Sequence, residues 1–406
     1  MSSQNSKTIN VYYSITDPFP AYRVDLTELV AVSLAAKGVD TTWYMAADAA
    51  DGRAGARDFL GQRCRVPRGA GGGALGRLRG RLAYWLSDAG LMLRAAFGRY
   101  DVLQVRDKYL VAALALLLAR LSGKRFVYWC SYPFPEHALQ TAAERAGAAR
   151  AVLAAKGWLA TQLLYRVVMR YADHNFVQSE QMLLDLRRYG IPAARMTAVP
   201  MGVPQRLLDW AAGHSVAVVP GRVAYLGSMG AVRHLDMLID AFALLRERCP
   251  QASLLMVGDG DVPHERAALE AQVARLGLQD SVCFTGFVPM EQAWSLAASA
   301  AVCVSPIHPT KLLAVASPTK LIEYMAMGRP VVCNEHPEQS SIIDASGAGL
   351  CVPWGAAHFA GAIGGLLARP EEAERMGAKG PAWAAADRSY PLIAERVLGQ
   401  YRRLLA

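Results

Sequence analysis

The strongest chemical signal in the sequence is a lysine, Lys320, in the first turn of a helix predicted to begin at Ser317 and Pro318. Serine is a favoured N-cap, and proline suits the first helical position. The unpaired N–H groups and the positive dipole end at such a terminus attract anions. A cation in that turn opposes the dipole, and a phosphate between the two would remove the conflict. We therefore predict a phosphate site around Ser317, Thr319 and Lys320, the alternative being a lysine that points into solvent.

Glu323 follows Lys320 by three residues, which is about 5 Å along the axis of a helix. At that depth a carboxylate can accept two hydrogen bonds from a ribose diol. The alternative is an ordinary i,i+3 ion pair with Lys320, which contributes a few tenths of a kcal/mol. The pair predicts one helix that contacts both the phosphates and the ribose of a nucleotide.

A glycine loop after another predicted strand could contact the same phosphates. Gly227-Ser228-Met229-Gly230 follows the strand-like run 223–226 and precedes a helix. Glycine lets the backbone approach a phosphate closely, Ser228 can donate a hydrogen bond to it, and Arg233 adds positive charge. Alone this is a weak signal, because a glycine turn after a strand is more often only a turn.

Two more strand-to-turn junctions lie further along the chain. Gly258 falls in the turn 257–261, and Phe287 and Val288 follow the strand-like run 282–285. The backbone around Phe287 and Val288 could hydrogen-bond the edge of a nucleobase. An equally good interpretation of that run is an ordinary core strand.

The elements that must position these residues alternate between strand and helix from end to end. Strand-like runs are 9–15, 39–45, 101–105, 125–130, 174–178 and 196–199, then 223–226, 253–257, 282–285, 301–305, 330–334 and 349–352. Helical patterns such as 26–37, 235–247 and 318–327 lie between them. The alternation predicts an α/β fold of two doubly wound, Rossmann-like domains that face each other across a cleft.

Changes in composition along the chain suggest where the domains begin and end. We predict an N-terminal domain over 1–203, a linker over 204–221 rich in proline and glycine, and a C-terminal domain over 222–385. Residues 386–406 are predicted as a C-terminal helix that could cross back to the first domain.

The overall composition narrows the class of protein. The chain has 406 residues, of which 53% are hydrophobic, and a net charge of +9, which favours an anionic partner. Seven cysteines without a CxxC pair fit a reducing cytoplasm and argue against disulfides or a zinc site. The longest uncharged apolar run, 109–119, is shorter than the roughly 20 residues that cross a bilayer, so no transmembrane helix is expected.

One segment, residues 62–98, does not fit the alternation. Six arginines lie between 63 and 81, while no acidic residue occurs between Phe59 and Ser87. Leucines recur at helical spacing there, next to an aromatic pair, Tyr84 and Trp85. We predict a basic amphipathic insertion that lies on an anionic membrane surface, the alternative being a surface helix with solvated arginines.

Together these stretches resemble the GT-B glycosyltransferases, closest in pattern to the retaining family 4, over nearly the whole chain. The motifs that carry the resemblance are Gly227-Ser228-Met229, Val257-Gly258-Asp259-Gly260, Phe284-Thr285-Gly286-Phe287-Val288, Glu323 followed by Gly328-Arg329-Pro330-Val331-Val332, Ala172-Asp173 with Gln178-Ser179-Glu180, and Val199-Pro200-Met201-Gly202-Val203. The resemblance implies transfer of a sugar from a UDP- or GDP-linked donor to an acceptor hydroxyl. By the same resemblance, donor binding falls to Gly227, Ser228, Arg233, Gly258, Phe287, Val288, Ser317, Thr319, Lys320 and Glu323.

The sequence departs from the family pattern at several positions. The first glutamate of the family's Glu-x7-Glu falls at Val315, and Ser228 and Arg233 stand in the places of an Arg and a Lys. Lys320 is expected to supply the missing charge, so that Arg233 and Lys320 stabilise the leaving diphosphate without a metal or other cofactor.

An inverting relative shares some of these departures. The glucuronosyltransferase of xanthan assembly has a similar Gly-Ser-Met loop and a similar Ser-x-x-Lys-Leu helix, which resemble 227–229 and 317–321. An inverting enzyme needs a general base on the acceptor side, and Asp107 is the predicted candidate. The reserve candidates are Asp17, Asp25, Glu136 and His137, and Asp107 could instead pair structurally with Arg106 or Lys108.

The predicted acceptor is a lipid-linked glycan bound by loops of the first domain, in the assembly of a bacterial surface polysaccharide or exopolysaccharide. The residues expected to contact it are Phe19, Tyr22, Arg23, Tyr132, Phe134 and His137. The enzyme would then be cytoplasmic and peripheral on the inner face of the plasma membrane. A nucleotide-sugar epimerase and a non-catalytic nucleotide-sugar binding protein are the rivals, while a nucleic-acid binder is disfavoured because aromatic residues hardly interleave with the arginines.

Overall fold

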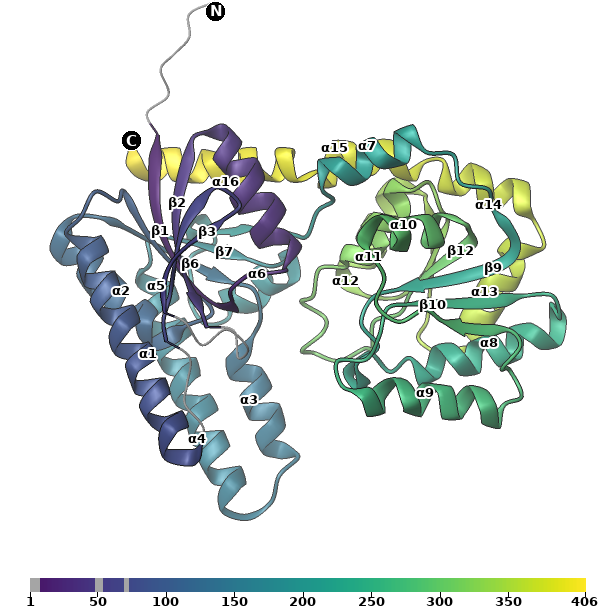
Figure 1. The fold of residues 1–406 in the computed structure, drawn as a ribbon, viewed down its shortest axis with the longest axis horizontal. Coiled ribbons are helices and arrows are strands. Elements are labelled where there is room, and N and C mark those ends of the chain that lie inside the picture. Colours follow the sequence, from purple (N-terminus) through teal and green to yellow (C-terminus); the bar gives the residue numbers. More distant parts are fainter. Residues whose placement is uncertain (1–7, 48–53, 69–72) are drawn as a thin grey trace, which may run out of the picture. The chain divides into compact units, whose positions relative to one another are not determined.

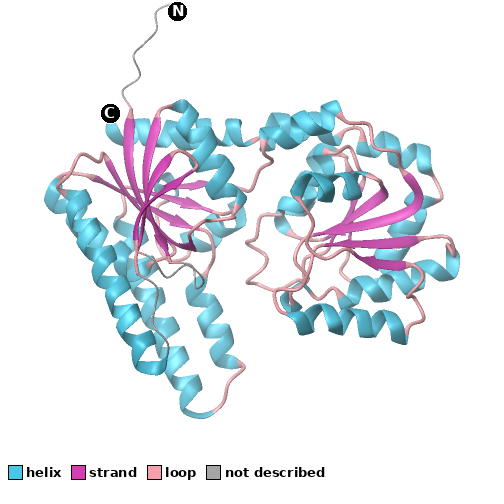
Figure 2. Cartoon of the chain, in the orientation of Figure 1, coloured by secondary structure: helices cyan, strands magenta, loops and turns pink. Residues whose placement is uncertain are grey.

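The computed structural model describes residues 8–47, 54–68 and 73–406 (Figure 1). The chain divides into two compact units. Unit 1 comprises Met1–Pro200 and Tyr390–Ala406, and unit 2 comprises Met201–Ser389. Each unit is a twisted sheet with helices on both faces (Figure 2), which confirms the predicted fold class of two Rossmann-like α/β domains.

Unit 1 contains an eight-stranded sheet with the order β3-β4-β2-β1-β5-β6-β7-β8. The strands are β1 (Ile9–Pro18), β2 (Val39–Ala46), β3 (Gly55–Phe59), β4 (Gln62–Val66), β5 (Val102–Arg106), β6 (Arg125–Cys130), β7 (His174–Val177) and β8 (Met196–Ala198). All neighbours pair in parallel except β3 and β4, which form an antiparallel hairpin at one edge. Central strands such as β5 and β7 are buried along their whole length, as expected of parallel strands covered on both faces.

The helices of unit 1 connect these strands. They are η1 (Asp25–Leu34), η2 (Ala35–Lys37), α1 (Gly73–Ala96), α2 (Tyr109–Ser122), α3 (Phe134–Ala143), α4 (Gly147–Leu163), η3 (Leu164–Val168), α5 (Met169–Tyr171), α6 (Glu180–Arg187), η4 (Ala193–Arg195) and α16 (Tyr390–Leu405). Helix α16 comes from the far end of the chain and packs into the core that β1, β2 and η1 form. Its buried residues include Tyr390, Val397 and Tyr401, and the Tyr401 hydroxyl donates to Gln104 Oε1 at 2.6 Å.

Unit 2 contains a six-stranded parallel sheet with the order β11-β10-β9-β12-β13-β14. The strands are β9 (Val219–Leu226), β10 (Ser253–Val257), β11 (Val282–Phe284), β12 (Ala300–Ser305), β13 (Val331–Asn334) and β14 (Gly349–Val352). The helices are α7 (Gln205–Gly213), η5 (Ala231–Arg233), α8 (Asp236–Arg248), α9 (Pro263–Arg275), α10 (Met290–Ala298), α11 (Thr319–Ala326), α12 (Pro337–Ser346), α13 (Ala356–Leu367), α14 (Pro370–Gly377) and α15 (Gly380–Arg388).

Two sequence predictions need correction. The predicted linker 204–221 contains helix α7 and the start of β9, because Leu207 is buried in the core of unit 2. The segment 62–98 is not helical throughout: 62–66 is strand β4, whose Cys64 and Val66 are buried in the core, and the helix is α1.

The predicted membrane-facing aromatic pair is divided between two environments. Tyr84 is half-buried and packs on Tyr44 with ring centroids 5.5 Å apart, and its contact with a membrane stays a prediction. Trp85 is 37% exposed, and Leu82 and Leu86 beside it are 61% and 66% exposed. The side chains of Arg77 and Arg81, two of the predicted basic cluster, lie outside the described residues. Within the described ranges, none of the helices has the length and hydrophobicity that a membrane span needs.

Candidate functional site

The sheet of unit 2 changes direction between strands β9 and β12. The chain passes from β9 to β10 and β11 on one side, and continues from β12 to β13 and β14 on the other. In open parallel sheets, ligands bind outside the carboxyl ends of the strands at such a switch point. The glycine loop 227–230 follows β9, and the loop that leads to α11 follows β12. The topology therefore gathers the predicted donor-binding residues at one edge of the sheet.

Two glycines bring the loops after β9 and β10 into backbone contact. Gly227 has a φ of +140° and donates its N–H to the Val257 carbonyl at 2.9 Å, while Gly258 has a φ of +125°. A Cβ atom on Gly258 would lie 2.2 Å from the Gly227 carbonyl oxygen, so no other residue fits there without movement of the loop. The edge of the site is therefore formed by backbone, which an anionic ligand can approach closely.

Lys320 is partly buried and is held against a tyrosine that the sequence analysis did not assign to the site. Its Nζ donates to Tyr225 Oη at 2.7 Å and lies 4.0 Å from the centre of the Tyr225 ring. Tyr225 Oη in turn donates to the Ser228 carbonyl oxygen at 2.8 Å. A Cβ on Gly227 would lie 3.2 Å from Nζ, which places the ammonium group beside the glycine loop. The alternative of a lysine pointing into solvent is therefore wrong.

The positive charge at this edge is not neutralised within the described part of the chain. Burial lowers the pKa of Lys320 well below its ordinary value, and the nearby Arg233 guanidinium lowers it further, while Glu323 opposes both effects. Arg233 Nε is buried without a hydrogen-bond partner, and neither cation lies within 4.0 Å of a carboxylate among the described residues. Two like charges held close together are costly unless an anion lies between them.

Glu323 lies on the inner face of α11 and is only 9% exposed. Burial raises its pKa to about 7, against the opposing effect of Lys320 and Arg206. Lys320 Nζ does not come within ion-pair distance of it, so the simple i,i+3 ion pair is absent from the described structure. No described residue donates a hydrogen bond to the Glu323 carboxylate, which leaves its oxygens free to accept from a ligand.

The start of α11 differs from the prediction. The helix begins at Thr319 with Pro318 in the cap position, and Ser317 caps nothing. Ser317 Oγ instead accepts from the Met201 N–H at 2.8 Å and donates to Glu338 Oε1 at 2.6 Å. The Met201 N–H therefore takes the place that an N–H of the first turn of α11 would have at an N-cap hydroxyl. Ser317 as an N-cap was therefore wrong, whereas Thr319 and Lys320 do occupy the first turn.

Two residues that brace the site escaped the sequence analysis. The Leu226 N–H donates to Tyr324 Oη at 2.6 Å, which ties the end of β9 to α11. The carboxylate of Glu265 accepts from three backbone N–H groups: Ala231 at 2.8 Å, Asp261 at 2.9 Å and Val262 at 3.1 Å. It thus joins the loops after β9 and β10. Neither contact could be found from the sequence, because the partners lie 98 and 34 residues apart.

Phe287 and Val288 lie after β11 at the same edge of the sheet. Strand β11 ends at Phe284, so both residues belong to the following loop rather than to a core strand. Phe287 is 77% exposed, and Val288 is partly buried against the core of unit 2. Their place is compatible with contact to a base, which stays a prediction.

The predicted general base, Asp107, is enclosed at the carboxyl end of β5 in unit 1. Its Oδ1 accepts from the Ser131 N–H at 3.0 Å, and its Oδ2 accepts from Ser131 Oγ at 2.5 Å and lies 3.5 Å from Arg106 Nε. Burial raises the pKa of Asp107, and Arg106 partly offsets this effect. Asp107 thus links the ends of β5 and β6, and each of its oxygens already accepts a hydrogen bond from Ser131.

The reserve candidates are engaged as well. Asp25 pairs with the buried Arg106 at 2.6 Å, and Glu136 accepts from Tyr165 at 2.6 Å and from Tyr189 at 3.4 Å. His137 Nδ1 lies 3.2 Å from Tyr132 Oη. Asp17 is the least constrained, with Arg23 Nε 3.9 Å away. Lys108 does not pair with Asp107 but with Asp88, at 2.8 Å.

Comparison with known families divides the chain at the same place as the fold. Residues 26–202 match the family model described as "Glycosyl transferase 4-like domain". Residues 220–369 match the one described as "Glycosyl transferases group 1". The two matches together cover most of the chain.

Two curated proteins are similar over part of the sequence. Alpha-D-kanosaminyltransferase of Streptomyces kanamyceticus is 29% identical over 183 residues, which is 45% of this chain and 45% of that protein. GDP-mannose-dependent alpha-(1-6)-phosphatidylinositol dimannoside mannosyltransferase of Mycobacterium tuberculosis is 29% identical over 196 residues, 47% of this chain and 48% of that protein. The chain spans about half the length of the curated relatives it matches.

Two solved structures share the fold over nearly the full length. Sucrose-phosphate synthase from Thermosynechococcus elongatus has a TM-score of 0.72 and 21% identity, with 98% of this chain and 99% of that chain covered. Anabaena HepE in complex with UDP has a TM-score of 0.68 and 15% identity, with 97% and 100% covered. At these identities the likeness shows the fold alone.

Proposed function

The chain belongs to the glycosyltransferases of the GT-B fold, and we propose that it moves a sugar from a nucleoside diphosphate donor, held by unit 2, to a hydroxyl of a lipid-linked glycan, held by unit 1. The similarity to transferases whose names include a GDP-mannose donor, and to a structure that holds UDP, supports a nucleotide sugar. The choice between UDP and GDP stays open. The context that fits best is the assembly of a bacterial surface polysaccharide or exopolysaccharide.

One observation carries the donor assignment: Lys320 and Arg233 interact electrostatically at the switch point of the sheet, both partly buried, and no carboxylate of the described residues lies within 4.0 Å of either. A diphosphate supplies the missing negative charge. The N–H groups of the first turn of α11 and the backbone of the Gly227 loop add hydrogen-bond donors at the same edge. Glu323 would accept hydrogen bonds from the ribose, one turn further along the helix.

The same groups account for catalysis in this proposal. Cleavage of the bond between the sugar and the diphosphate leaves an additional negative charge on the leaving group. Fixed cations and N–H donors that already face the phosphates stabilise that charge without having to reorganise. We therefore propose that Arg233 and Lys320 do this work without a metal ion.

A retaining outcome is the favoured form of the proposal. An inverting enzyme needs a free general base near the acceptor, and Asp107, Asp25 and Glu136 are all engaged by donors within unit 1. Asp107 is better understood as a positioning residue that fixes the ends of β5 and β6. Inversion with Asp17 as the base is the alternative, and the stereochemistry of the product would decide between the two.

A screen of nucleotides tests the proposed function. Thermal unfolding in the presence of UDP, GDP and their sugar conjugates should show stabilisation by one base, and the purified protein should slowly hydrolyse the matching nucleotide sugar. Binding without any hydrolysis or transfer would support the non-catalytic alternative, to which the Val315 departure points. Stabilisation by none of these nucleotides would refute the proposed donor site.

Peripheral attachment to the inner face of the plasma membrane is part of the proposal. Helix α1 exposes Leu82 and Trp85, and a basic amphipathic helix of this kind binds anionic lipid surfaces. The double variant Leu82→Ser with Trp85→Ser should therefore sediment with phosphatidylglycerol vesicles several-fold less than the unmodified protein.

The matched control for that prediction lies in unit 2. Val262 and Leu276, the cap residues on either side of α9, are 41% and 40% exposed, so replacing both by serine removes exposed apolar surface elsewhere. Vesicle binding should be unchanged in this control. If the α1 variant sedimented as well as the control, α1 would be an ordinary surface helix.

A further inference from the structure

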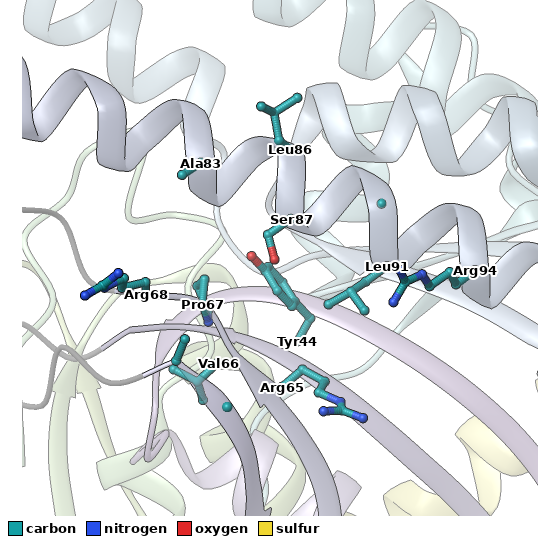
Figure 3. Close-up of a pocket in the computed structure, with 13 residues that line it drawn as sticks. Tyr44, Arg65, Val66, Pro67, Arg68, Ala83, Leu86, Ser87, Leu91 and Arg94 are labelled. Carbon is teal, nitrogen blue, oxygen red and sulfur yellow. The ribbon is translucent and has the colours of Figure 1, made fainter.

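A second candidate site lies in unit 1, on the opposite face of the sheet from the core that α16 completes. It is a pocket of about 630 Å³ between helix α1 and strands β2 and β4 (Figure 3). The α1 residues that line it recur along one side of the helix: Ala83, Leu86, Ser87, Gly90, Leu91 and Arg94. At a rise of 1.5 Å per residue they extend over about 16 Å, so the pocket is an elongated groove.

The walls of this groove combine apolar and basic side chains. Tyr44 and Ser87 meet near its centre in Figure 3, with Leu91, Val66 and Pro67 around them. Three arginines line it, namely Arg65, Arg68 and Arg94. No carboxylate lines the groove, and none lies within 4.0 Å of these arginines in the described ranges.

We propose that the groove binds the phosphate end of an amphiphile, with a phosphate or diphosphate ester between the arginines and an apolar chain along α1. Guanidinium groups bind phosphate oxygens in pairs of hydrogen bonds, and the exposed Leu86 with the partly exposed Leu91 suits a hydrocarbon chain. A small inorganic anion would leave the apolar walls exposed to water. The assignment of this amphiphile to the acceptor's lipid carrier rests on the proposed function.

The place of the groove on the sheet supports that assignment. Arg65 and Arg68 lie at and just after the carboxyl end of β4, and Asp107 follows the carboxyl end of β5. In the sheet order, β4 and β5 are separated by β2 and β1, which corresponds to about 14 Å at the usual spacing of strands. A diphosphate at β4 would thus lie at the length of a short saccharide from the acceptor end of β5.

A glycine in the groove allows the site to be filled without touching its charges. Gly90 is a helical residue of α1, and a Cβ there would meet nothing within 4 Å, so Gly90→Phe should fold and place a ring in the groove. Gly361 in α13 of unit 2 is equally open and gives the control Gly361→Phe. A second variant, Arg65→Ala with Arg68→Ala and Arg94→Ala, removes the charges. Its control replaces three other exposed arginines of unit 1, Arg187, Arg188 and Arg195, by alanine.

Calorimetry with farnesyl diphosphate, a short water-soluble prenyl diphosphate, tests the proposal. Binding should weaken at least tenfold in Gly90→Phe and in the triple arginine variant, and should not change in either control. Inorganic pyrophosphate and uncharged farnesol should each bind at least tenfold more weakly than farnesyl diphosphate. Nucleotide binding by unit 2 should stay the same in every variant, so this test and the test of the donor site can fail separately.

Three outcomes would overturn the proposal. Equal binding of farnesyl diphosphate by Gly90→Phe and the unmodified protein would show that the groove is not the site. If pyrophosphate bound as tightly as farnesyl diphosphate, the apolar walls would contribute nothing to binding, and the ligand would not be an amphiphile. Displacement of farnesyl diphosphate by phosphatidylglycerol nanodiscs at equal lipid concentration would show that the ligand is bulk phospholipid and not the acceptor.

Discussion

Replacement of Lys320 by alanine should lower turnover by roughly 10²–10³-fold, the usual effect of removing one fixed donor that stabilises charge in a transition state. Lys320 is held beside the Gly227 loop by Tyr225, so its ammonium faces the predicted diphosphate before the reaction begins. Steady-state kinetics of donor hydrolysis and of sugar transfer would measure the loss. The decrease should appear in kcat, because the charge to be stabilised develops as the diphosphate leaves.

The fold should survive this substitution. Lys320 is a partly buried cation next to another cation, Arg233, and its removal relieves their repulsion. The melting temperature of Lys320→Ala should therefore equal or exceed that of the unmodified protein. Lys311→Ala, at an exposed lysine in the loop before α11, is the matched control and should retain full turnover. Turnover of Lys320→Ala within threefold of the control would exclude the phosphate role.

Replacement of Glu323 by alanine should weaken nucleotide binding by about 10–100-fold, the range expected when hydrogen bonds to a charged group are lost. The Glu323 carboxylate has no donor within the described structure and lies one turn from Lys320 on the same helix. If it binds the ribose diol, the unmodified protein should prefer UDP or GDP to the matching 2′-deoxynucleotide. Glu323→Ala should bind both nucleotides equally weakly.

Glu291, an exposed carboxylate in the first turn of α10, provides the control for this measurement. Glu291→Ala should bind the nucleotide and discriminate against the 2′-deoxy form as the unmodified protein does. A Glu323→Ala variant that kept the full preference for the ribose would contradict the assignment, whatever its absolute affinity.

The pH dependence of the free energy of unfolding provides a second test, of whether the Glu323 carboxylate is buried. Burial raises its pKa from 4.5 to about 7, so between these values the folded state binds more protons than the unfolded state. The contribution of Glu323 to stability is therefore fully present below about pH 4.5 and is lost as the pH rises through 7. Glu323→Gln should remove this loss and gain up to on the order of 3 kcal/mol over the unmodified protein at pH 8, measured by urea unfolding. Parallel pH profiles of the two proteins would mean that Glu323 is solvated.

The buried parallel strands were the part of the fold that the sequence predicted best. The buried strands β6 and β10, and the partly buried edge strand β14, have the bounds predicted for them, because each is a short apolar run. The antiparallel hairpin of β3 and β4 was missed, since its strands lie at the sheet edge and half of their residues are exposed. Helices α3 and α4 were missed; they pack on each other, as the contact of Gly157 with Leu139 shows.

The placement of candidate-site residues could be predicted where those residues are close together in the sequence. Lys320 and Glu323 are neighbours on one helix, as the sequence predicted, and their contacts with a phosphate and a ribose stay predictions. Tyr225 was not predictable as the partner of Lys320, because 95 residues separate the two in sequence. Ser317 was misassigned for the same reason. Its hydroxyl hydrogen-bonds to two residues distant in sequence, Met201 and Glu338, and not to the adjacent helix.

Helix α16 determines the order in which the two units can mature during biosynthesis. The ribosome completes residues 201–389 before residues 390–405, yet Tyr390, Val397 and Tyr401 belong to the interior of unit 1. Unit 2 can therefore fold while the nascent chain is still growing, whereas unit 1 must wait with an open apolar face until its last helix emerges. A nascent chain paused after residue 389 would carry a finished unit 2 and an unfinished unit 1, which is the unit that chaperones should bind.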